Sequence, residues 1–266
     1  MTLTILFVGD VVGEPGRTAL YRELPALKEE FGADLTIVNG ENAAGGRGIT
    51  PKIALEFFSR GVDVITTGDH VWDQPDLIPW MPHAPRLLRP LNYQADTPGF
   101  GCVVVETPKG NVAVMQLQGR SFIQPPLENP FILGEEEALR LRRGGVTAIF
   151  VDMHAETSSE KVAMGYNLDG KASALIGTHT HVQTADNMVM PGGLAYMTDA
   201  GMCGSAVSVL GRDVRGVLRR FRSTLPAKFP VAGWPVRLCG AVVSVDMETG
   251  RALGIVRVNR MYAERP

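Results

Sequence analysis

The sequence is poor in cysteine, in net charge and in long apolar runs. Its three cysteines, Cys102, Cys203 and Cys239, are widely spaced and form no CxxC pair, which argues against a disulfide framework and against a cysteine zinc site. Unpaired thiols are typical of the reducing cytoplasm, where we expect the protein to work. No apolar stretch approaches the roughly 20 residues that span a bilayer, so no membrane segment is predicted.

Charge is nearly balanced, with 26 basic and 28 acidic side chains and a formal net charge of −2. Proteins that bind long nucleic acids usually carry a basic excess, so that class is not expected, whereas a small anionic substrate is compatible. The 45% hydrophobic and 20% charged residues are typical of a folded enzyme. The 266 residues can bury one large core, and we predict a single domain over residues 1–266, with homo-oligomerisation left open.

The first part of the chain alternates short apolar runs with amphipathic stretches, which is typical of β-α-β units. Thr50 is a suitable helix N-cap, Pro51 suits the first helical position, and Gly61 follows the expected last turn. The strands on either side of this helix are expected to be parallel neighbours. The predicted elements are the strands Leu3–Val8, Leu35–Val38 and Val62–Thr66 and the helices Arg17–Phe31 and Pro51–Arg60.

The rest of the chain combines two predicted antiparallel hairpins with the same alternation. Turn residues at 107–110 separate the strands of the first hairpin, and residues 248–250 separate those of the second. An α/β fold with two sheets packed face to face is predicted from this mixture. The elements are the strands Cys102–Glu106, Val112–Leu117, Ala148–Met153, Leu175–Gly177, Leu194–Met197, Ala241–Asp246 and Leu253–Val258 and the helices Gly134–Arg143 and Val214–Arg222.

Five of the apolar runs lead directly into side chains that can bind a metal ion. In α/β sheets, ligands bind beyond the carboxyl ends of the strands, so these side chains should meet at one rim of the sheet. A single Asp or His after a strand is more often a turn or structural residue, but four of the five histidines follow this pattern and only His83 does not. The residues are Asp10, Glu41, Asn42, Asp69, His70, His154, His179 and His181.

The chemistry of these side chains favours a transition-metal site. His179 and His181 lie two residues apart, so on an extended segment their side chains point the same way. Imidazole together with carboxylate and amide oxygen suits Fe, Mn or Zn better than Ca or Mg. The donors outnumber what one tetrahedral ion needs, so two divalent ions bridged by a carboxylate are predicted, an arrangement typical of phosphoryl chemistry.

The same residues lie in strings that resemble the calcineurin-like metallophosphoesterase superfamily, and within it the bacterial branch of YmdB phosphodiesterases. The resemblance covers essentially the whole chain. The matching strings are Gly9–Gly13, Val38–Gly46, Thr67–Asp73, Asp152–Glu156, Gly177–Gln183 and Thr198–Met202.

This resemblance implies a four-layer α/β/β/α sandwich with a two-metal site in which Glu41 bridges the ions. His70 would protonate the leaving oxygen of the substrate. One string departs from the family, because the usual Gly-Asn-His reads Gly68-Asp69-His70 and so adds a negative charge to the ligand set. The implied ligands are Asp10, Glu41, Asn42 and His181 for one ion and Glu41, Asp69, His154 and His179 for the other.

The implied function is hydrolysis of small phosphodiesters, in particular 2′,3′- or 3′,5′-cyclic nucleotides. Two alternatives stay open: a phosphomonoesterase or nucleotidase, and a metal-binding regulatory protein with vestigial catalysis, which Asp69 motivates. Arg47, in the glycine-rich segment 43–48, is a candidate substrate contact, although these glycines could equally serve turns. For Arg120 and Asn129, in a Pro-rich loop, surface packing is favoured over a substrate contact.

Overall fold

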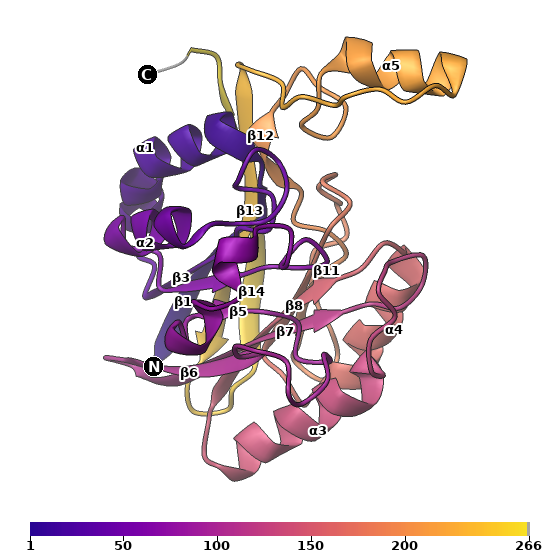
Figure 1. Cartoon of the computed structure of the whole chain (residues 1–266). Coiled ribbons are helices and arrows are strands. Elements are labelled where there is room, and N and C mark those ends of the chain that lie inside the picture. Colours follow the sequence, from indigo (N-terminus) through magenta and orange to yellow (C-terminus); the bar gives the residue numbers. More distant parts are fainter. Residues whose placement is uncertain (265–266) are drawn as a thin grey trace.

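Two β-sheets pack face to face in the structure, a computed structural model that describes residues 1–264, and helices cover the outer side of each sheet (Figure 1). The first sheet has the strand order β2-β12-β13-β1-β3-β4-β5, and β14 pairs with β13. Its strands and the helices beside it are β1 (Thr2–Val8), β2 (Asp10–Val11), α1 (Gly13–Phe31), β3 (Leu35–Asn39), α2 (Pro51–Ser59), β4 (Val64–Thr66), β5 (Leu87–Leu88), β12 (Met202–Ser205), β13 (Val236–Asp246) and β14 (Ala252–Tyr262).

The second sheet has the order β10-β11-β9-β8-β7-β6 and carries α3 and α4 on its outer side. Helix α5 (Val214–Ser223) projects away from the body of the molecule, and two 3₁₀ turns lie at Pro75–Leu77 and Met81–His83 (Figure 1). The elements of this half are β6 (Cys102–Thr107), β7 (Gly110–Gln118), α3 (Pro130–Arg143), β8 (Ala148–His154), α4 (Ser158–Leu168), β9 (Ala174–Thr178), β10 (Met188–Val189) and β11 (Ala195–Met197).

The layers follow from the alternation of side chains along each strand. In β1, Ile5 and Phe7 pack between the two sheets, whereas Leu6 and Val8 pack on the opposite face with the residues of α1 and α2. Across the interface Phe7 meets Phe150 of β8, with ring centroids 5.1 Å apart. Because both faces of the central strands are buried, one by helices and the other by the second sheet, these strands read as continuous apolar runs. The predicted four-layer α/β/β/α sandwich is confirmed.

Sequence analysis misplaced the starts of two helices and missed a third. Helix α3 begins at Pro130 rather than Gly134, with Asn129 as its N-cap. Helix α1 begins at Gly13 rather than Arg17, because Pro15 lies in the first turn, where a missing N–H costs no helical hydrogen bond. Helix α4 was not predicted, since it buries Lys161 where an apolar residue would mark its inner face. Strand β12 is short and contains Gly204, so it also carried no clear pattern.

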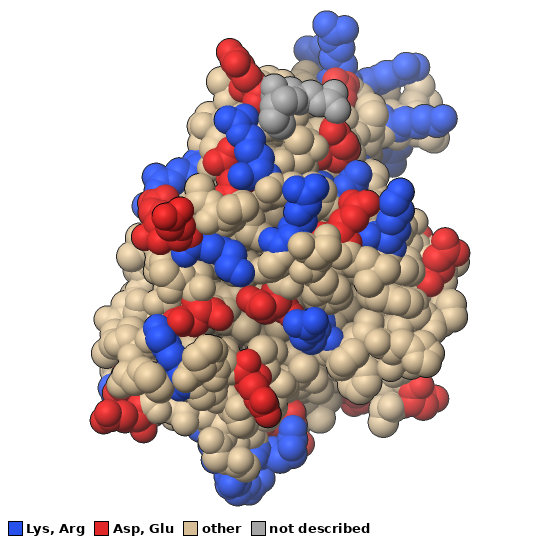
Figure 2. Space-filling view, turned by 90° about the vertical axis from the view of Figure 1, so that its left-hand side faces the viewer, with Lys and Arg blue, Asp and Glu red and all other residues tan. Residues whose placement is uncertain are grey.

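The surface matches the balanced composition. On the face shown in Figure 2, acidic and basic side chains are interspersed over most of the area. Across residues 1–264, no helix combines the length and the apolar character needed to cross a bilayer.

Candidate metal centre

The five strand ends predicted to carry metal ligands meet at one place, but they come from both sheets. Strands β1, β3 and β4 belong to the first sheet, and β8 and β9 to the second. The expectation of a single sheet rim was therefore wrong in this detail. The two sheets face each other with these carboxyl ends on the same side, so side chains from both reach a common centre.

Two overlapping groups of side chains could each hold a metal ion. Within each group the nearest donor atoms all lie within 4.8 Å of one another, and Glu41 belongs to both groups. Asn42 joins them, because its Nδ2 donates to Glu41 Oε1 at 2.6 Å and lies 3.3 Å from His181 Nε2. The groups are Glu41, Asp69, His154 and His179, and Asp10, Glu41 and His181.

The centre has the character of a cation site. Asp10 Oδ1 is buried and makes no hydrogen bond, an arrangement that costs free energy unless another partner is supplied. Glu41 Oε2 is also buried and faces His154 Nε2 at 3.1 Å. Gly68 leaves the centre open, since a Cβ at this position would clash with Glu41 Oε2 and His154 Nε2. Carboxylate, amide and imidazole donors in this number fit divalent transition-metal ions.

The pKa shifts of the buried residues also indicate a cation site. Burial, and then the charge of Glu41, raise the pKa of Asp10 well above its ordinary value. Burial alone would lower the pKa of His154, but the carboxylates of Glu41 and Asp69 raise it well above its ordinary value. A proton on His154 thus partly balances the carboxylates, and cations bound at the centre would displace it.

Contacts outside the cluster orient two of the imidazole rings. His181 Nδ1 lies 3.1 Å from the carbonyl oxygen of Leu210, and His154 Nδ1 lies 2.9 Å from Thr178 Oγ1. Thr178 Oγ1 in turn donates to Asp152 Oδ1 at 2.7 Å. If each Nδ1 donates in these contacts, Nε2 of both rings carries the lone pair that faces the cluster, as in metal sites generally.

The loop that carries His179 and His181 is strained and is held by one buried carboxylate. His179 and His181 have φ values of 94° and 64°, a region that costs about 1–3 kcal/mol for a non-glycine residue. Between them, the backbone N–H and the hydroxyl of Thr180 donate to Asp199 Oδ2 at 3.1 and 2.7 Å. The same oxygen pairs with Lys161 Nζ at 2.7 Å, and both partners are fully buried.

Sequence analysis missed this support. Lys161 lies on the unpredicted helix α4, and Asp199 was noted only as part of a family string. Two charged residues within largely apolar segments were the available signal, because a buried charge needs a partner.

His70 and Arg47 lie together at the edge of the centre, and Asp73 links them. His70 Nδ1 is 3.2 Å from Asp73 Oδ2 and 3.8 Å from Asp69 Oδ2, while Arg47 Nε is 2.8 Å from Asp73 Oδ2. These three residues line an open pocket of about 490 Å³ together with Asp69 and His179. Asp73 is a further residue whose role the sequence did not reveal.

The neighbouring loop residues have structural tasks. Gly45 and Gly46 have positive φ, and the guanidinium of Arg212 donates to the carbonyl oxygens of both, so these glycines serve a turn. The side chain of Asn129 caps α3 by accepting from Phe131 N at 3.0 Å. Asn129 therefore has a structural role at the start of α3.

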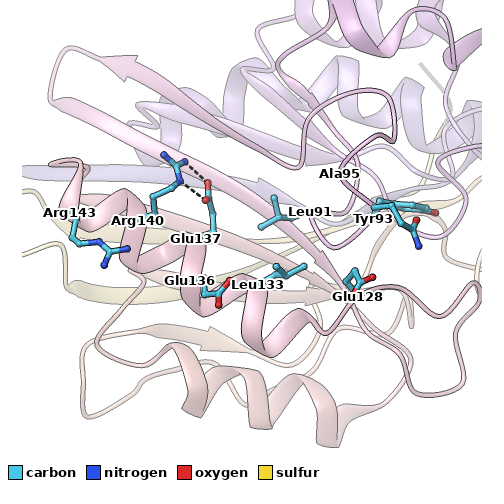
Figure 3. A pocket seen from close by; sticks show the side chains of 10 residues that line it. Leu91, Tyr93, Ala95, Glu128, Leu133, Glu136, Glu137, Arg140 and Arg143 are labelled. Carbon is cyan, nitrogen blue, oxygen red and sulfur yellow. Dashed lines mark hydrogen bonds and ion pairs between the residues drawn. The ribbon is translucent and has the colours of Figure 1, made fainter.

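A larger cavity of about 890 Å³ lies between α3 and residues 91–95 (Figure 3). Leu91 and Leu133 lie at its wall, and Arg140 turns toward Glu137, with which it pairs at 2.6 Å. None of the eight strand-end candidates is among the described residues that line this cavity. It is therefore separate from the metal centre.

The layers and the shared ligand cluster define the class: the chain has the calcineurin-like metallophosphoesterase fold. The model of the YmdB-like protein family matches residues 6–258, and the chain belongs to this family.

Individual relatives agree with this assignment over nearly their whole length. The chain is 44% identical to the 2′,3′-cyclic-nucleotide 2′-phosphodiesterase of Bacillus subtilis over 256 residues, 96% of each protein. The crystal structure of a novel phosphatase of Mycoplasma pneumoniae superposes with a TM-score of 0.93 at 32% identity, covering 99% of this chain and 95% of that one. A hypothetical protein of Thermus thermophilus gives a TM-score of 0.89 at 35% identity, covering 98% of this chain and 100% of that one.

Proposed function

We propose that the protein is a two-metal phosphodiesterase whose substrates are 2′,3′- or 3′,5′-cyclic nucleotides. The observation that carries the proposal is the pair of ligand groups that share Glu41. Family membership makes the protein a metal-dependent phosphoric ester hydrolase. The activity of the Bacillus subtilis relative supports the narrower choice of cyclic nucleotides.

The ligand sets follow the two groups. Asp10, Asn42 and His181 would hold one divalent ion and Asp69, His154 and His179 the other, with Glu41 shared between them. Mn or Fe suits these mixed nitrogen and oxygen ligands best, and Zn is the next choice. Ions held there would polarise the phosphoryl oxygens and lower the pKa of water.

The remaining chemistry belongs to residues at the edge of the centre. His70 lines the pocket and has Nδ1 next to Asp73, so its Nε2 is left for a proton that passes to the leaving oxygen. Arg47 lines the same pocket, and its guanidinium has further N–H groups with which to bind a phosphate oxygen. The three free cysteines fit the cytoplasm as the site of action.

A phosphomonoesterase is the second candidate, because the Mycoplasma pneumoniae relative was solved as a phosphatase. Assays with bis-p-nitrophenyl phosphate, p-nitrophenyl phosphate and the two cyclic forms of AMP, each with Mn, distinguish the candidates. We expect faster turnover of the diester and of a cyclic nucleotide. Preference for the monoester would favour the phosphatase. Protein that binds two ions and hydrolyses none of the four would be a regulatory metal-binding protein.

A further inference from the structure

Phe122 is an aromatic side chain that the fold itself does not explain. The residue is 90% exposed, although phenylalanine is usually buried. Its backbone has φ 59°, a conformation that bulky residues seldom adopt. An exposed ring on strained backbone contributes little to folding, and strained residues of this kind cluster at functional sites.

The ring stands beside the metal centre. Phe122 to Pro125 form one wall of the 490 Å³ pocket, and the same pocket is lined by Asp69, His70 and His179. This volume falls within the range of about 300–1,000 Å³ that is typical of pockets for small ligands. The pocket therefore offers a metal-binding and proton-donating side together with an aromatic and apolar side.

The loop that carries Phe122 is fixed at both ends. At its start, Gly119 N donates to the carbonyl oxygen of His154 at 2.8 Å, which ties the loop to a candidate ligand. Asn92 Nδ2 donates to the carbonyl oxygens of Gln118 and Glu128, each at 2.9 Å, and so joins the two ends of the loop. These hydrogen bonds hold both ends of the loop beside the centre.

We propose that Phe122 is the platform on which the base of a nucleotide substrate stacks while its phosphodiester lies at the metal centre. The inference rests on the proposed phosphodiesterase function and makes it more specific, because it selects nucleoside phosphodiesters over diesters without an aromatic group. Exposed aromatic side chains stack bases of any sequence, and losing one such contact weakens binding by about 5- to 100-fold.

The test compares two cyclic phosphodiesters, of which only one has a base: adenosine 2′,3′-cyclic monophosphate and glycerol 1,2-cyclic phosphate. With the metal-loaded enzyme, Phe122→Ala should lower kcat/KM for the adenosine substrate by about 5- to 100-fold, chiefly through KM. Turnover of the glycerol substrate should not change, and Phe122→Trp should retain the adenosine activity. Phe221→Ala is the matched control, since Phe221 is 80% exposed on α5 and does not line the pocket.

Equal losses for both substrates, or no loss for either, would overturn the role of Phe122. Calorimetric binding of adenosine 3′-monophosphate and of inorganic phosphate gives a second measurement that needs no turnover. The wild type should prefer the nucleotide, and Phe122→Ala should abolish that preference. If the wild type cleaves neither of these substrates nor the 3′,5′-cyclic form of AMP, the proposed function fails, and the binding comparison alone decides whether Phe122 contacts a base.

Discussion

The metal centre and the pocket wall beside it are built in opposite ways. The centre collects side chains from five strand ends, and Asp10, Glu41 and His154 are almost completely buried there. The wall consists of loop residues 122–125, and Phe122 is almost fully exposed. Strands fix the positions of ligands closely, whereas loops vary readily and commonly carry specificity. Under the proposed function, we therefore expect the chemistry to depend on the framework and the choice of substrate to depend on the loop.

The largest effect should come from the residue shared by both ligand groups. Glu41→Gln keeps the size of the side chain but removes its charge, so we expect metal content to fall to one ion per chain or fewer. Activity should fall by more than about 10²-fold, since even residues that only orient metal ligands cost about 10- to 100-fold. Elemental analysis and diesterase assays after Mn reconstitution measure both effects.

Glu136→Gln is the control for Glu41→Gln, because Glu136 lines the separate cavity beside α3 (Figure 3). Its metal content and activity should equal those of the wild type. A Glu41→Gln protein that still holds two ions would show that Glu41 is not the bridge.

A second variant separates proton transfer from metal binding. His70→Ala should retain both ions yet lose about 10² to 10⁴ in rate, the usual contribution of a positioned acid. The loss should be smallest for substrates with good leaving groups, which need no proton. His83→Ala, which changes the one histidine that does not follow a predicted strand, should leave the rate unchanged. Loss of metal from His70→Ala would instead identify His70 as a ligand.

The sequence predicted the candidate ligands at the strand ends far better than the residues that surround and position them. Asp10, Glu41 and His154 could be predicted because each directly follows an apolar strand, and parallel strand ends converge. Asp199 was not predicted, because its bonds to the backbone and hydroxyl of Thr180 are seen only in the folded loop. Phe122 was missed for a related reason: only the folded loop shows that its ring is exposed and next to the centre.

A smaller effect should follow from loosening the loop between His179 and His181. Asp199→Asn alone would leave Lys161 buried without a counter-charge, which is strongly destabilising, so the double variant Lys161→Met/Asp199→Asn is preferred. We expect a folded protein with about 10- to 100-fold weaker Mn binding by calorimetry, because supports of metal ligands contribute on this scale. Unchanged Mn affinity in the folded double variant would mean that Asp199 only stabilises the core.

The smallest effect concerns Asp69, the carboxylate that replaces the amide of the wider superfamily. In the metal-free protein, burial would raise the pKa of Asp69, but its hydrogen bonds with His154 and His179 lower the pKa well below the ordinary value. The pKa of His154 is raised by the same pairing and by Glu41. A lowered carboxyl pKa stabilises the fold above the unfolded value of about 4, and a raised imidazole pKa stabilises it below the unfolded value of about 6.5. The contact between Asp69 and His154 should therefore stabilise the metal-free protein most between about pH 4 and 6.5. With a chelator present, Asp69→Asn should lower Tm more at pH 5.5 than at pH 9, because the stabilisation that depends on the His154 proton declines as the pH rises above about 6.5. The variant should also weaken metal retention when Mn is supplied. A higher Tm at pH 5.5, or tighter Mn binding, would show that Asp69 is not an ionised member of the cluster.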